Sequence, residues 1–142
     1  MLGVIAGDII GSVYEFDRHK RKDFPLFTSQ SAFTDDSILS VAVAEAILRG
    51  GCYGESIKRY AQRYPNPMGG YGARFSLWAF SQLAESASIK PYNSWGNGSA
   101  MRVSPVGFAF DVMEDLLTAA RHTAEVTHNH PEGIKGAQAT AA

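Results

Sequence analysis

Apolar side chains recur at three- and four-residue steps along almost the whole chain, and no segment shows a sustained two-residue alternation. This period places apolar residues on one face of an α-helix, whereas a half-buried strand needs the two-residue alternation. A chain of 142 residues is of ordinary size for one domain. We therefore expect a single all-α domain. Its helices are expected over residues 2–13, 34–48, 55–64, 74–86, 111–120 and 131–142.

Three of these helix starts carry recognisable sequence signals. Thr34 is followed by Asp35 and Asp36, so its hydroxyl can cap a free amide and the two acids favour the positive end of the helix dipole. Asp111 precedes Glu114 by three residues, which is the spacing of a capping box. Pro131 suits the first position of a helix.

The first helix is expected to be buried, although it contains Gly3, Gly7 and Gly11. A glycine weakens a helix by about 0.5–1 kcal/mol relative to alanine, so we expect a close approach of another element to require these three. Residues 18–30 show no period and are expected to form a long exposed loop.

Composition excludes several classes of protein. Thirteen lysines and arginines face fourteen aspartates and glutamates, which lacks the basic surplus of a general nucleic-acid binder. Cys52 is the only cysteine, so a disulfide framework is excluded. No apolar run is long enough to span a bilayer, and residues 1–13 carry Asp8 without a basic start, unlike a signal peptide. We expect a cytoplasmic protein with no membrane partner.

The first segment with candidate chemistry is residues 34–37, a threonine, two aspartates and a serine. A capped helix start explains them without any function. Alternatively, two carboxylates and a hydroxyl at a fixed position are the hard oxygen ligands that Mg²⁺ or Mn²⁺ prefers. Residues 7–12 with Glu15 also have a structural and a functional interpretation. Tight helix packing explains their glycines without any function.

The second segment is residues 93–102, which contain a Gly-Asn-Gly turn followed by a helical stretch. A turn is the simplest interpretation. If a helix starts there, Gly98, Ser99 and Ala100 offer backbone amides of the kind that bind a pyrophosphate. Trp95 lies near enough in sequence to stack on a base or a sugar.

The third segment is residues 127–133, with His128 and His130. For His130 a helix cap or a surface position is the simpler interpretation. A His-x-His pair also ligates zinc, but no cysteine or third histidine stands nearby to complete a tetrahedral site.

Taken together and in this order, these motifs resemble the ADP-ribosylglycohydrolase family. The matching stretches are residues 7–16 (GDIIGSVYEF), 33–37 (FTDDS), 96–102 (GNGSAMR) and 127–130 (THNH). The resemblance implies an all-α orthogonal bundle of one domain over residues 1–142. It also implies hydrolysis of the bond between ADP-ribose and an acceptor, either on a protein or in a small molecule.

The resemblance further implies two divalent ions, Mg²⁺ or Mn²⁺, and assigns residues to them and to the substrate. The metal-site residues would be Glu15, Thr34, Asp35 and Asp36. Of these, Glu15 and Asp36 would be the catalytic residues that position a water or move its proton. The residues that hold ribose and phosphates would be Asn97, Gly98, Ser99, Ala100 and Met101, with His128 lining the nucleotide pocket.

One departure from the family pattern is clear. Family members complete the metal site with an Asp-x-Asp-Thr type motif in a later helix, whereas this sequence has no aspartate after Asp115. It therefore resembles the N-terminal half of a family member, and we expect an apparently truncated bundle with an incomplete metal site. Helices that begin at Thr34 and Pro131 would then leave apolar faces open, so we expect self-association.

Two functions of other classes stay open at this point. A domain that keeps the segment around Gly98 would bind ADP-ribose without turning it over. A non-catalytic structural protein would use the scaffold alone.

Overall fold

The computed structural model describes residues 1–17, 19–81 and 90–142. Within these residues the chain forms eight helices and no strand, apart from an isolated bridge between Thr34 and Met68. The helices are α1 (Leu2–Gly11), α2 (Asp35–Arg49), α3 (Tyr53–Arg63), α4 (Ala73–Phe80), α5 (Gly98–Met101), α6 (Ser104–Ala109), α7 (Met113–Glu125) and α8 (Pro131–Ala141). The all-α fold class predicted from the period is confirmed.

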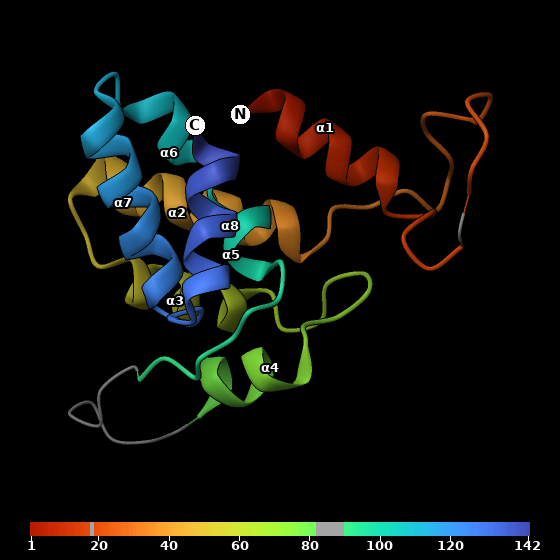
Figure 1. Cartoon of the computed structure of the whole chain (residues 1–142). Helices are drawn as coiled ribbons and strands as arrows, with labels where there is room; N and C mark the ends of the chain where they lie inside the picture. Colours follow the sequence, from red (N-terminus) through yellow and green to blue (C-terminus); the bar gives the residue numbers. More distant parts are fainter. Residues whose placement is uncertain (18, 82–89) are drawn as a thin grey trace.

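Helix α2 is the central element of this bundle (Figure 1) and contacts α1, α3, α5 and α6. Helices α7 and α8 pack along each other, and α8 also contacts α5 and α6. One apolar core joins these elements. Its buried members include Ile38, Leu39, Val43, Ile57, Phe75, Trp78, Val106 and Leu116 on the helices and Val103 just before α6.

The ends of α2 follow the sequence signals. The Thr34 hydroxyl accepts a hydrogen bond from the Asp36 amide at 3.2 Å, so the predicted cap is present. Gly50 ends the helix with a φ of 63°, a left-handed conformation that glycine adopts without steric cost. Residues 38–48 are apolar on nearly every face, which predicts a helix surrounded by protein. This prediction is wrong at the C-terminal end of α2, because Leu48 is 86% exposed.

The environment of α1 differs from the predicted one. None of its residues is buried, and a Cβ placed on Gly3, Gly7 or Gly11 would meet nothing within 4 Å. The prediction that α1 is buried and needs its glycines for a close approach is therefore wrong for this structure. The apolar period shows correctly that α1 has an apolar face, but a period carries no information about what covers that face.

Helix α7 starts later than its capping-box spacing predicts. Val112 has an extended backbone with φ −96° and ψ 123° and precedes the first helical residue, so Asp111 lies outside the helix and provides no cap. The helical period predicts Val112 and Met113 on the inner face of this helix, but both are more than half exposed. The buried face instead consists of Leu116, Ala119, Ala120, Thr123 and Ala124.

The fourth predicted helix, residues 74–86, is only partly tested. Helix α4 ends at Phe80, and Ser81 is extended with ψ 123°. The rest of the predicted helix, from residue 82, lies outside the described residues. Residues 19–30 contain no regular element, in agreement with the predicted loop.

Helix α8 begins at Pro131 as predicted and packs on its own chain. Its buried positions Gly133, Ala137 and Ala141 face α5, α6 and α7. The interpretation that α8 leaves its apolar face uncovered is therefore wrong, while self-association of the chain stays a prediction. No helix in the described part of the chain is long and apolar enough to cross a membrane.

Candidate active site

The site is built on the N-terminus of α2, which a residue of α1 holds in place. One oxygen of Asp8, Oδ2, accepts hydrogen bonds from the Thr34 amide at 2.8 Å and the Ser37 amide at 3.2 Å. The other oxygen, Oδ1, accepts from the Thr34 hydroxyl at 2.6 Å. A helix N-terminus leaves free amides that favour a negative partner. Asp8 thus fixes α1 against α2 with one carboxylate.

Thr34, a predicted metal-site residue, takes part in these hydrogen bonds. It is 1% exposed, donates its hydroxyl hydrogen to Asp8 and accepts from the amide of Asp36. A hydroxyl in this position orients the start of α2 and therefore the two acids that follow it.

The other three predicted metal-site residues meet in one cleft. Glu15, Asp35 and Asp36 line a cavity of about 300 Å³ together with the loop of residues 69–72. Gly69 has a φ of 78°, and a Cβ there would lie 3.4 Å from Glu15 Oε2, so this loop approaches the carboxylate as only glycine permits. A shared metal site requires Glu15 and Asp35 to lie on the same side of the molecule, and they do.

The carboxylates in this cleft perturb one another. Burial, together with the negative charges of Asp36, Glu15 and Asp8, raises the pKa of Asp35 from 3.8 to about 7. Burial also raises the pKa of Asp36, with added contributions from the charges of Asp8 and Glu15. Crowded, partly buried carboxylates are costly without a cation, so the donor chemistry of the cleft suits a hard divalent ion.

The cleft nevertheless supplies only part of a ligand set. Among the described residues, no three side chains of histidine, cysteine, aspartate or glutamate are arranged to hold a metal ion. The described chain therefore provides candidate ligands rather than a completed metal centre.

Asp35→Asn should raise the free energy of unfolding at pH 8 by about 1–2 kcal/mol, a value reduced for the partial exposure of this side chain. The folded pKa of about 7 lies above the ordinary value of 3.8, so the folded chain holds this proton more tightly than the unfolded chain. The stability that the protonated group contributes is complete below pH 4 and is lost as the pH rises through 7. Urea unfolding of both proteins at pH 5 and pH 8, with Asp111→Asn as an exposed control, measures the gain. An equal effect at both pH values would contradict it.

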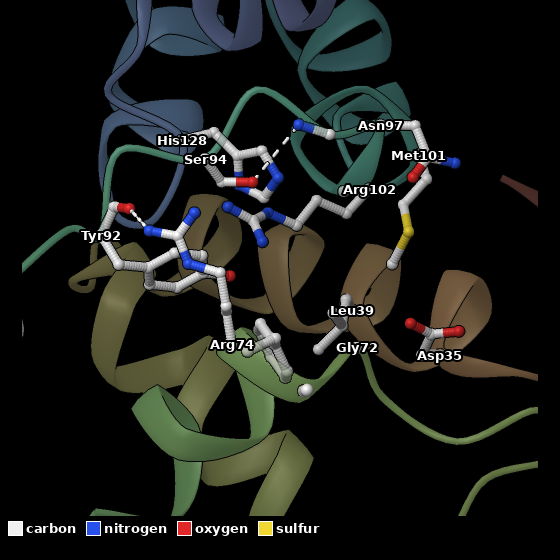
Figure 2. A pocket seen from close by; sticks show the side chains of 14 residues that line it. Asp35, Leu39, Gly72, Arg74, Tyr92, Ser94, Asn97, Met101, Arg102 and His128 are labelled. Atoms are coloured by element: carbon white, nitrogen blue, oxygen red, sulfur yellow. Dashed lines mark hydrogen bonds between the residues drawn. The ribbon is translucent and has the colours of Figure 1, made fainter.

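A second cavity, of about 350 Å³, adjoins the carboxylate cleft. Figure 2 shows its cationic side chains Arg74 and Arg102 at one end and Asp35 at the other. The loop of residues 96–98 and His128 form another wall. Asp35 thus faces both cavities.

The predicted substrate-binding residues divide into two groups. Asn97, Gly98, Met101 and His128 line this second cavity, as the sequence interpretation requires. Ser99 is buried, and its hydroxyl donates to the carbonyl of Gly133 at 2.7 Å, which ties α5 to α8.

Ala100 does not line this second cavity either, and its amide is not free. It donates to the Asn97 carbonyl at 2.8 Å. The prediction that it offers an amide to an anion is therefore wrong. Trp95 is 72% exposed and also lies outside the cavity lining.

The two histidines of residues 127–133 have different roles. His130 is the N-cap of α8, where its Nδ1 accepts from the Glu132 amide at 3.1 Å, so the simpler interpretation is confirmed. His128 is buried against Gly98, where a Cβ would lie 3.1 Å from Nε2. Burial, together with the charges of Arg102 and Arg74, lowers the pKa of His128 to about 4. The imidazole is neutral at pH 7.

Four side chains and one loop of the site were not assigned a role from the sequence. Asp8 and Arg102 stand inside the matched stretches without an assigned role, and Arg74 and Tyr92 lie outside them. The prolines and glycines of residues 65–72 predict only a loop. Their glycines were the available signal, because a Gly-Gly-x-Gly run permits a close backbone approach to a ligand.

The sequence was also compared with known proteins. The sequence model of the ADP-ribosylglycohydrolase family matches residues 1–142. The chain is 28% identical to human (Homo sapiens) ADP-ribosylhydrolase ARH3 over 96% of its own length and 46% of the relative. It is 28% identical to the Mus musculus protein of that name and, over 75% of its length, 30% identical to the Gallus gallus protein.

The chain spans less than half the length of these relatives. The family match nevertheless extends over the entire sequence and includes both walls of the site. The chain belongs to the ADP-ribosylglycohydrolase family.

Proposed function

We propose that the chain binds ADP-ribose and contributes to the hydrolysis of its bond to an acceptor, with Mg²⁺ or Mn²⁺ as cofactor. The observation that carries this proposal is the junction of the two cavities, where Asp35, Asn97 and Met101 line both. A ligand that fills the larger cavity reaches the carboxylate cleft there. The acceptor is an ADP-ribosylated protein or a small molecule that contains ADP-ribose.

The side chains of the cleft have distinct tasks in this reaction. Glu15, Asp35 and Asp36 would hold a divalent ion, which when bound polarises a ribose hydroxyl or lowers the pKa of a water. Cleavage of a glycosidic bond builds positive character on the anomeric carbon, which nearby carboxylates stabilise. Asp36 and Glu15 orient the attacking water and take its proton. Asn97 and Met101 position the ribose between the two cavities.

The cationic end of the larger cavity suits the phosphates. Arg74 and Arg102 give this end a positive potential, while the carboxylates keep the other end negative. A ligand with phosphates at one side and a hydroxyl-rich sugar at the other matches this polarity. The names of the relatives, ADP-ribosylhydrolases, support the same substrate class.

A second candidate function is binding of ADP-ribose without turnover. It is favoured by the incomplete ligand set, since the described residues include no group of three metal-ligating side chains. The larger cavity, in contrast, is lined by residues of three of the four matched stretches, 33–37, 96–102 and 127–130. The release of free ADP-ribose therefore distinguishes hydrolysis from binding without turnover.

Asp36→Ala should reduce the release of ADP-ribose by at least about a hundredfold, the usual worth of a general base. The assay uses arginine- and serine-modified peptides with and without Mg²⁺, and calorimetry with ADP-ribose measures binding in parallel. Binding should change by less than about threefold, because Asp36 does not line the larger cavity. Glu114→Ala, an exposed carboxylate at the start of α7, is the matched control.

Three outcomes decide between the candidates. Metal-dependent release that Asp36→Ala abolishes supports hydrolysis. Binding of ADP-ribose by the unchanged chain without any release supports the second function. A chain that neither binds nor releases ADP-ribose overturns both.

A further inference from the structure

Arg102 is the largest side chain in the described structure that is completely buried. Its Nη2 donates to the Thr123 carbonyl at 3.0 Å and to the Thr127 hydroxyl at 2.7 Å. Its Nε and Nη1 have no hydrogen-bond partner, and no ion pair with it occurs among the residues described. A buried cation without a carboxylate is costly, so a role beyond packing is needed to explain it.

The hydroxyl of Thr127 connects Arg102 to His128. Its Oγ1 lies 2.7 Å from Nδ1 of His128. A guanidinium is a donor only, so Oγ1 accepts from Arg102. The positive charge of Arg102 beside this oxygen disfavours a second N–H donor on it, so the single hydroxyl hydrogen of Thr127 is directed to Nδ1 of His128.

The direction of this hydrogen bond determines where the imidazole carries its proton. When Nδ1 accepts, the neutral ring holds its hydrogen on Nε2. The positive charge of Arg102 favours the same arrangement, because it attracts the Nδ1 lone pair and repels an N–H at that position. Hydrogen bonds in such a chain also polarise and strengthen one another.

His128 lines the cavity, and its Nε2 is the ring nitrogen that does not contact Thr127. It lies against the loop of residues 96–98, 3.1 Å from the position of a Cβ on Gly98, and it makes no hydrogen bond among the described residues. An N–H at this position is a free donor beside the second cavity, whose lining side chains are drawn in Figure 2.

We propose that Arg102 and Thr127 are positioning residues that fix His128 as the Nε2–H tautomer. The cavity then presents a neutral donor to an acceptor atom of the nucleotide, a ring nitrogen or an oxygen without a hydrogen. This inference rests on the proposed function for the identity of the ligand. The tautomer itself is a property of the free protein.

The test compares Thr127→Val, which keeps the shape and removes the hydroxyl, with Thr127→Ser, which keeps the hydroxyl. Nitrogen-15 NMR of the His128 ring reports which nitrogen carries the hydrogen in the ligand-free proteins. We expect Nε2–H in the unchanged protein and in Thr127→Ser, and Nδ1–H or a mixture in Thr127→Val. Calorimetry should show a loss of ADP-ribose affinity of about tenfold for Thr127→Val, the worth of one hydrogen bond, and less than about threefold for Thr127→Ser.

The two proposals fail in different ways. Nδ1–H in the unchanged protein, or an unaltered ring and affinity in Thr127→Val, overturns the relay. Arg102→Lys keeps a charge and a donor at this position, so it should retain the Nε2–H signal if it folds. The expected ring signals in a chain that binds no ADP-ribose support the relay and overturn the proposed ligand.

Discussion

Replacing Asp8 with alanine should lower the free energy of unfolding by about 2–4 kcal/mol, because it strands donors that share one charged acceptor. The Thr34 amide, the Thr34 hydroxyl and the Ser37 amide all donate to this carboxylate. Helix α1 buries no residue and has little else to hold it against α2. Urea unfolding followed by circular dichroism measures the loss.

The control for this prediction is Asp111→Ala. Asp111 is also an aspartate near a helix start, but it is exposed and provides no cap to α7. Its replacement should change the stability by less than about 0.5 kcal/mol. Equal losses for the two variants would show that the Asp8 hydrogen bonds do not hold the helices together.

Replacing Gly133 with alanine should destabilise the fold by about 1–3 kcal/mol, the range for an added methyl group in a packed interior. A Cβ at this position would lie 2.8 Å from the carbonyl oxygen of Ser94 and 3.0 Å from Cβ of His128. Both neighbours belong to the wall of the larger cavity. We therefore also expect weaker ADP-ribose binding, which calorimetry measures in the same preparation.

Gly136→Ala provides the matched comparison one turn along the same helix. The nearest atom to a Cβ there is the Ala100 Cβ at 4.0 Å, an ordinary contact. Alanine in a helix interior then stabilises by about 0.5–1 kcal/mol, because it restricts the unfolded chain. Opposite signs for the two glycines would confirm that packing against the cavity wall decides the effect. A stabilising Gly133→Ala would contradict the close approach.

Local signals in the sequence predicted the local structure well. Thr34 and Pro131 mark helix starts through interactions within a few residues, and each holds its predicted position. The capping-box prediction for Asp111 is wrong because the extended Val112, and not Asp111, is the residue that precedes the first helical turn. A capping-box pattern shows only that the side chains are able to form a cap. The backbone conformation that leads into α7 decides whether the cap forms.

The parts of the site that join distant segments were harder to predict. Motif order placed Glu15, Asp35 and Asp36 in one cleft, and the structure puts them there. The bonds from Asp8 to α2 and from Arg102 to Thr127 were not predicted, because a single sequence records no partner for a long-range hydrogen bond. Residue identity shows that a carboxylate needs donors, but only the fold shows which donors it meets.

The loose attachment of α1 has a consequence for the affinity of the cleft. Asp8 and Thr34 are 26 positions apart, so their contact closes a long loop and has to compensate its entropy. A helix that buries no residue opens with a smaller free energy than the core. Glu15 follows α1 in the chain and moves away from the cleft when α1 opens. The full set of carboxylates therefore exists only in molecules in which α1 is closed against α2. The apparent affinity of any cation for the cleft is then the intrinsic affinity multiplied by that closed fraction.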